Sequence, residues 1–133
     1  MSAANIAFVQ SLYAAFRRGD IDTIVAATSA DVHWEAVGRP TDFPLLGVRK
    51  GHDGVRDFFR VLGELQDIVQ FEPRDFHAAD AMVFVSGHYA WTLRKTGKRA
   101  ESDWLHVFAI TDGKVSAFRD FTDTARFVEA YRS

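Results

Sequence analysis

The second half of the chain consists almost entirely of segments typical of strands, and this constrains its fold more than any other feature. Four such segments follow one another, over residues 68–77, 81–94, 99–110 and 115–122. The turn sequence Thr111-Asp112-Gly113-Lys114 joins the last two, and Lys95-Thr96-Gly97-Lys98 joins the second to the third. Short turns that contain glycine connect neighbouring antiparallel strands. The sequence therefore predicts a meander of long strands.

The first half of the chain predicts helices. Apolar residues recur at helical spacing over 4–18 and 53–66, and Asp20 is suited to cap a shorter helix over 21–27. One strand is expected over 31–37. The segment 38–51 contains two of the three prolines and three of the nine glycines, which favours a loop. A short helix or coil is expected at the end of the chain, over 127–131.

Helices followed by a strand meander favour an α+β fold, in which helices pack on one face of a curved antiparallel sheet. A chain of 133 residues can bury one sizeable core but is too short for two ordinary domains, so one domain over 1–133 is expected. Three helices on the concave face of such a sheet leave a cone with an open mouth. A mouth of this kind is a natural pocket for a small hydrophobic molecule.

Composition excludes several classes of function. The chain has no cysteine, so disulfides, thiolate catalysis and Cys-based metal sites are excluded. Its 16 basic and 18 acidic residues form no long run of one sign, which does not favour nucleic acid or an anionic membrane as a partner. No stretch reaches the roughly 20 apolar residues of a membrane span, and the N-terminus lacks the pattern of a signal peptide. We therefore expect a cytoplasmic protein.

His106 and Asp120 are the candidate catalytic pair. They lie on the two strands of the last hairpin, which can hold them on one face of the sheet. Strand alternation places Trp104, Phe108 and Phe118 on that same face. A histidine and a carboxylate among aromatic rings are typical of an acid–base pair. The alternative is a core histidine that is satisfied by Asp120 or by a backbone carbonyl.

The strand over 81–94 has two faces, which the same alternation separates. One set consists of Met82, Phe84, Ser86 and His88, and we expect Phe84 and His88 to line the pocket. The opposite, apolar set consists of Val83, Val85, Tyr89 and Trp91. In a monomer these side chains would be exposed to water. We therefore expect a homodimer that forms through the outer face of the sheet.

Several runs of the sequence resemble one family. They are Leu12-Tyr13-Ala14-Ala15-Phe16-Arg17-Arg18-Gly19-Asp20, Gly47-Val48-Arg49-Lys50-Gly51, Trp104-Leu105-His106-Val107-Phe108 and Phe118-Arg119-Asp120-Phe121-Thr122-Asp123-Thr124. Together they look like the nuclear transport factor 2-like superfamily, and within it the SnoaL-like and ketosteroid-isomerase-like branch. The resemblance covers nearly the whole chain and implies a cone-shaped, cystatin-like α+β roll. The superfamily hosts isomerases, cyclases, dehydratases, epoxide hydrolases and non-enzymes.

The resemblance also implies roles for particular residues. In SnoaL-like cyclases a strand carries a His, and the following strand carries a catalytic Asp fourteen positions later, a spacing that His106 and Asp120 reproduce. In ketosteroid isomerases a catalytic Asp lies at the end of the first strand, where this chain has Glu35. The catalytic Tyr of those isomerases falls at about Leu12. Tyr13 is one position on, so it is expected to point elsewhere on the helix and to pack near the substrate.

These residues predict an enzyme that uses no cofactor or metal and removes a proton next to the carbonyl group of its substrate. Asp120 or Glu35 would be the base, and His106 would donate to the enolate oxygen or shuttle the proton. Trp34 and Glu35 are neighbours on one strand, so only one of them can face the cavity. Substrate contacts are expected from Tyr13, Trp34, Phe84, His88, Trp104, Phe108 and Phe118. Isomerisation, cyclisation, dehydration and epoxide opening stay open, and the competing expectation is a module that binds a hydrophobic ligand without turnover.

Overall fold

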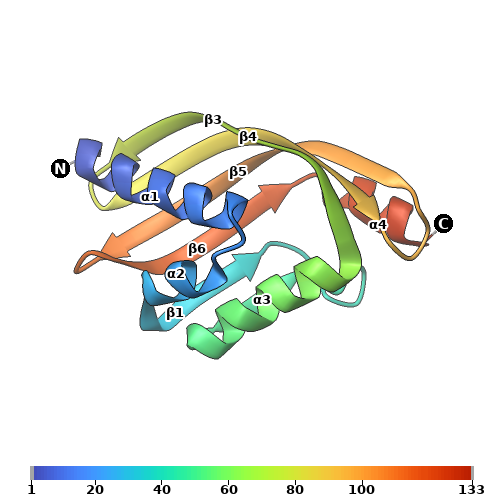
Figure 1. Cartoon of the computed structure of the whole chain (residues 1–133), viewed down its shortest axis with the longest axis horizontal. Helices are drawn as coiled ribbons and strands as arrows, with labels where there is room; N and C mark the ends of the chain where they lie inside the picture. Colours follow the sequence, from blue (N-terminus) through green and yellow to red (C-terminus); the bar gives the residue numbers. More distant parts are fainter. Residues whose placement is uncertain (1, 133) are drawn as a thin grey trace.

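The computed structural model describes residues 2–132 and shows an α+β fold with helices on one face of a curved sheet (Figure 1). Within that range the helices are α1 (Ser2–Arg17), α2 (Ile21–Ala26), α3 (Gly51–Leu65) and α4 (Thr124–Arg132). The strands are β1 (Thr28–Ala36), β2 (Gly47–Lys50), β3 (Gln66–Ala79), β4 (Met82–Leu93), β5 (Arg99–Thr111) and β6 (Lys114–Thr122). The predicted fold class is confirmed. None of the helices within this range is long and apolar enough to cross a membrane.

The sheet has the strand order β2-β1-β6-β5-β4-β3. Strands β3 to β6 form the predicted antiparallel meander, in which His106 lies directly opposite Asp120. β1 joins the other edge of β6 and runs parallel to it, with Trp34 opposite Phe118. The sequence did not predict this parallel pair, because the two strands come from opposite ends of the chain. Its consequence is that β1, β6 and β5 lie side by side and present their inner faces to the same space.

The two longest helices bury one stripe each against the sheet. α1 packs on β3 and β4, and α3 packs on β1. The stripes follow the spacing of an amphipathic helix, with Val9, Leu12 and Tyr13 buried in α1 and Val55, Phe58 and Leu62 buried in α3. Between them, the Asp20 carboxylate accepts a hydrogen bond from the Thr23 backbone N–H at 3.2 Å, which confirms the predicted cap of α2.

Some boundaries differ from the prediction. Residues 47–50, expected within a loop, form the edge strand β2, which pairs antiparallel with β1. The helix expected from residue 53 begins at Gly51. The terminal helix is longer than expected and starts at Thr124, with one residue between it and the end of β6.

The larger error concerns the two faces of β4. Val83 lies opposite Phe108 and Val85 opposite His106, so the apolar set shares the inner face of the sheet. Its members are buried within the chain: Val83, Val85, Tyr89 and Trp91 are 0–6% exposed. The expected assignment was therefore inverted. Because this apolar face is the core of the monomer, the stated reason for a homodimer does not hold, and the dimer stays an untested prediction.

Candidate functional site

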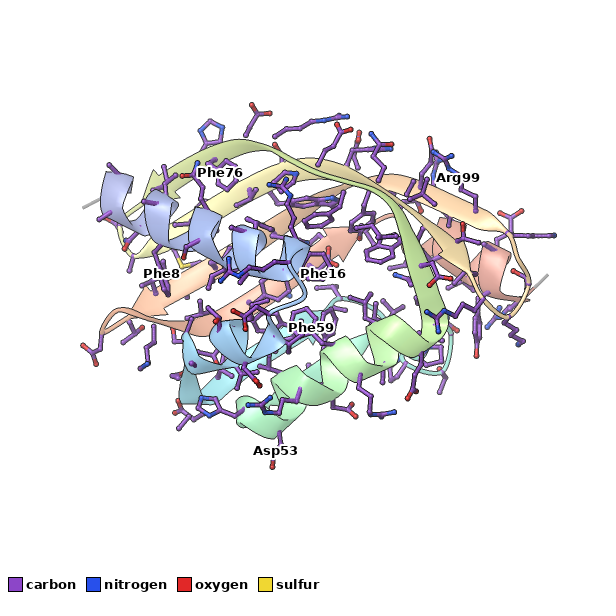
Figure 2. All side chains as sticks on the ribbon, viewed as in Figure 1. Phe8, Phe16, Asp53, Phe59, Phe76 and Arg99 are labelled. Carbon is purple, nitrogen blue, oxygen red and sulfur yellow. The ribbon has the colours of Figure 1, made fainter. Side chains whose placement is uncertain are left out.

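A pocket lies between the helices and the inner face of the sheet. Its cavity volume is about 100 Å³, whereas one ordered water needs roughly 10–15 Å³ counted in the same way. The wall is mostly aromatic and aliphatic, and it draws on α1 to α4 and on β1, β3, β4, β5 and β6. Figure 2 shows two of its aromatic residues, Phe16 from α1 and Phe59 from α3, lying near one another between those helices. Their ring centroids are 6.0 Å apart.

His106 and Asp120 meet in this pocket. Both line it, from directly opposite positions on β5 and β6. The His106 Nε2 and Asp120 Oδ1 atoms are 3.4 Å apart, and the two side chains are 8% and 12% exposed. Asp120 is the only carboxylate among the described residues that line the pocket. The structure thus brings the two predicted side chains together in a mostly apolar space.

Tyr13 completes one end of this group. Its hydroxyl lies 2.7 Å from His106 Nδ1. Burial, and secondarily the negative charge of Asp120, raises the pKa of Tyr13 well above its usual value, so the phenol keeps its proton and donates it to Nδ1. In the neutral imidazole the remaining N–H is then on Nε2, facing Asp120. Tyr13 lines the pocket beside His106, and so does its neighbour Leu12. The sequence did not predict the hydrogen bond of Tyr13 to the imidazole.

Tyr89 lies at the other end and was missed as a site residue. Its hydroxyl is 3.4 Å from each carboxylate oxygen of Asp120. Burial, followed by the charge of Asp120, raises the pKa of Tyr89 well above its usual value, so this phenol is also a donor. The error followed from the inverted faces of β4. The apolar character of the Val83, Val85 and Trp91 set could have identified Tyr89, because such a run marks the core side of a strand.

Trp104 packs against the His106 ring. It does not line the pocket, but its ring stacks on the His106 ring with centroids 3.9 Å apart. The indole fits because Gly87 lies opposite it on β4, and a Cβ at Gly87 would collide with the Trp104 ring and with the Glu72 carbonyl oxygen. Trp104 therefore orients the histidine ring and has no place in the cavity wall.

Besides Tyr13, three of the predicted aromatic residues line the pocket: Trp34, Phe108 and Phe118. Trp34 and Phe118 lie opposite one another on β1 and β6, and their rings stack with centroids 4.2 Å apart. Phe118 also meets the edge of the His106 ring, with centroids 4.9 Å apart. These contacts make a flat aromatic wall beside the His106–Asp120 pair.

Three other predicted residues lie outside the pocket wall. Glu35 is on the opposite face of β1 from Trp34, where it pairs with His33 at 3.1 Å and Arg119 at 3.2 Å. The hydrogen bond from His33, and then that from Arg119, lowers the pKa of Glu35 below its usual value. His88 and Phe84 lie on the outer face of β4. The alternation of β1 and β4 places all three side chains away from the cavity.

The described residues contain no group of three His, Asp or Glu side chains placed to hold a metal ion. The side chains that can act chemically in the pocket are the carboxylate of Asp120, the imidazole of His106 and the phenols of Tyr13 and Tyr89. They form one chain of contacts from Tyr13 through His106 and Asp120 to Tyr89. This arrangement can accept a proton at Asp120 and donate hydrogen bonds to a neighbouring oxygen.

Comparison with known proteins shows what this chain is similar to. The model of the SnoaL-like domain matches residues 9–118. An NTF2-like protein of Burkholderia thailandensis is 33% identical over 95% of both chains, with a TM-score of 0.85. An NTF2-like protein of Burkholderia xenovorans is 27% identical over 98% of both chains, with a TM-score of 0.89. TerC, co-crystallised with polyporic acid, is 28% identical over 97% of this chain and 98% of its own, with a TM-score of 0.85. No curated protein matches the sequence.

Proposed function

The chain belongs to the SnoaL-like family, as its sequence motifs predicted, and we propose that its pocket is the active site of an enzyme acting on a small hydrophobic carbonyl compound. The reaction begins with removal of a proton from the carbon next to the carbonyl group. The observation that supports this most directly is the position of Asp120: it is the only carboxylate among the described lining residues, within 3.4 Å of both His106 and Tyr89.

In this proposal Asp120 is the general base. One of its oxygens takes the proton from the substrate carbon, and the electron pair of the broken C–H bond moves to the carbonyl oxygen to form an enolate. The long contacts of the Tyr89 hydroxyl leave it free to turn toward that oxygen and stabilise its charge. A contact that is loose before substrate arrives is usual for catalytic groups.

His106 orients the base, and the proton taken from the substrate stays on Asp120 until it is returned. The His106 Nε2–H faces Asp120, and Tyr13 fixes that tautomer from the other nitrogen. Return of the proton to a different carbon gives isomerisation. Attack of the enolate carbon on a second carbonyl, with return of the proton to the alkoxide oxygen that forms, gives cyclisation. The aromatic wall around Trp34 and Phe118 excludes water and suits a flat substrate.

A non-catalytic role in ligand binding is the second candidate, and it is favoured by the mostly apolar wall of the pocket. Epoxide hydrolysis has less support. That reaction usually needs an arginine beside the acid, and Arg119 lies on the other face of β6, paired with Glu35.

Hydrogen–deuterium exchange tests the proposal without knowledge of the natural substrate. A panel of hydrophobic cyclic ketones is incubated with the protein in D₂O, and NMR follows the loss of protons next to the carbonyl. Asp120→Asn should slow this exchange by about 100-fold or more. Asp103→Asn is the matched control, because Asp103 also pairs with a histidine but on the outer face, and it should leave the rate unchanged.

Exchange by Asp120→Asn at the wild-type rate would remove Asp120 from the mechanism. Ketones that bind wild-type protein without any exchange would favour the ligand-binding role instead.

A further inference from the structure

Two residues that line the pocket each carry a buried polar atom without a hydrogen-bond partner. The atoms are the indole Nε1 of Trp34 and the amide Oε1 of Gln66. The two residues are 4% and 5% exposed, and both line the pocket. The other unpartnered buried side-chain atoms among the described residues belong to Ser29 and Trp104, which do not line it. Buried polar atoms are nearly always paired, so an unpaired donor and an unpaired acceptor in one pocket call for an explanation.

The strand register fixes how far Trp34 lies from Asp120, the proposed base. On β1 it pairs with Phe118, and Asp120 pairs with Ala36, two residues further along the parallel strands. Two residues along a strand are about 6.6 Å, and residues two apart point to the same face. A ligand whose reacting carbon is at Asp120 therefore extends past the Trp34 indole if it is the size of a fused ring system.

Gln66 lies at another part of the wall. It is the first residue of β3, directly after α3, and it lines both the pocket and a shallow groove on the surface. Phe16 and Phe59, which face one another between α1 and α3 in Figure 2, also line both. Gln66 is therefore in the partition between the pocket and the outside.

We propose that Trp34 and Gln66 form a polar recognition subsite for a hydroxylated ligand. An oxygen of the ligand accepts a hydrogen bond from Trp34 Nε1, and a ligand hydroxyl donates to Gln66 Oε1. The assignment of the carbonyl end to Asp120 rests on the proposed function, whereas recognition by Trp34 and Gln66 needs no turnover.

The physical basis is the cost of leaving buried polar groups unpaired. A ligand that supplies the missing acceptor and donor replaces two unmet hydrogen bonds, and an apolar ligand of the same shape leaves them unmet. A site of this kind strongly rejects a ligand that lacks the hydrogen-bonding group. A purely hydrophobic site rejects a ligand of the wrong size less strongly. We expect about 10-fold in affinity for each hydrogen bond.

The test uses four probes of similar shape: 6-hydroxy-1-tetralone, 6-methoxy-1-tetralone, 1-tetralone and tetralin. Wild-type protein labelled with ¹⁵N is titrated with each, and the indole N–H signals are followed by NMR. Loss of one signal in Trp34→Phe assigns the Trp34 resonance. We expect the hydroxyketone to bind at least 10-fold more tightly than tetralin and to move the Trp34 N–H signal downfield, as a new hydrogen bond does.

Gln66→Met tests the other half of the subsite with a side chain of similar length. It should remove the preference for hydroxyl over methoxy while changing the affinity for 1-tetralone by less than about two-fold. Gln10→Met is the matched control, because Gln10 is exposed on α1, and it should retain the preference. Trp34→Phe keeps an aromatic ring on Phe118 and gives an independent result if Gln66→Met fails to fold.

Equal binding of all four probes, no detectable binding of the hydroxyketone at millimolar concentration, or a Trp34 signal that does not move would each overturn the subsite. Deuterium exchange measured on the same ketones separates this from failure of the proposed function. Shifts at Trp34 without exchange would retain the subsite and contradict the enzyme. Deuterium exchange together with equal binding of the hydroxyketone and the other probes would retain the enzyme and contradict the subsite.

Discussion

Two histidine–aspartate pairs occupy opposite faces of the same sheet. His106 and Asp120 lie directly opposite one another on β5 and β6, and His88 and Asp103 do so on β4 and β5. The outer pair is the closer one: His88 Nδ1 and Asp103 Oδ1 are 2.9 Å apart, against 3.4 Å for the inner pair. Neither cross-strand register nor contact distance distinguishes a candidate site from a surface contact.

The surroundings make the difference. The Asp103 side chain is 86% exposed, so water screens its charge and solvates it. The Asp120 side chain is 12% exposed and touches a second donor, Tyr89, while His106 is held by Tyr13 and Trp104. A pair becomes a candidate for chemistry when the sheet places it against helices that exclude water. The following experiments test this distinction.

Exchanging the two histidines for glutamine gives the largest expected contrast. His106→Gln removes the imidazole that faces Asp120 but keeps a polar side chain, and it should slow deuterium exchange in cyclic ketones by about 10- to 100-fold. His88→Gln should keep the exchange rate within two-fold of wild type. NMR of the ketone protons in D₂O measures both. Equal losses in the two variants would show that burial does not decide which pair matters.

Packing at the inner face gives the second contrast. Gly87→Ala should destabilise the fold by about 1–3 kcal/mol, because the new Cβ collides with the Trp104 ring and the Glu72 carbonyl oxygen. Since Trp104 stacks on His106, the same variant should also perturb the imidazole signals. Urea unfolding measures the first effect and NMR the second.

Gly63→Ala is the control for this change, because a Cβ at Gly63 in α3 meets no atom within 4 Å. It should stabilise the protein by about 0.5–1 kcal/mol through helix propensity. A Gly87→Ala protein as stable as wild type would mean that Trp104 can move away from the strand, and that it does not fix the position of His106.

How far the sequence predicts this molecule depends on the range of the contacts involved. The meander, the main helices and the facing positions of His106 and Asp120 follow from local periodicity and short turns, and the structure has them. The parallel contact of β1 with β6 does not follow, because it joins distant segments. Tyr89 was misplaced for a related reason. Which way a side chain faces depends on what packs against its element, and a sequence pattern leaves that open for a strand with two partly apolar faces.

Alkaline pH gives the third contrast, through the two buried phenols. The pKa values of Tyr13 and Tyr89 are raised in the fold above the value of about 10 expected in the unfolded chain. The unfolded chain therefore loses these protons first, and the fold loses stability as the pH rises above 10. Each phenol should cost up to about 1.4 kcal/mol per pH unit.

Tyr89→Phe should show a shallower loss than wild type between pH 10 and 11, because only Tyr13 then contributes this cost. Urea unfolding at pH 9, 10 and 11 measures the difference. Parallel curves for the two proteins would mean that Tyr89 ionises in the fold as readily as in water, and that the inner face is wetter than its burial indicates.

The smallest effect is expected from the outer-face acid that the family resemblance favoured as a base. His33 and Arg119 lower the pKa of Glu35 below the usual 4.5, so its ion pairs stabilise the fold above that pH and this stabilisation is lost as the pH falls. Partial exposure to water limits the effect of Glu35→Gln to about 0.5 kcal/mol at pH 7. Urea unfolding should show this difference at pH 7 and a smaller one at pH 3.5, and ketone exchange should stay at the wild-type rate. A loss of exchange comparable to that of Asp120→Asn would show that Glu35 reaches the substrate from the far side of β1, and the division of the sheet into a reactive inner face and a solvated outer face would fail.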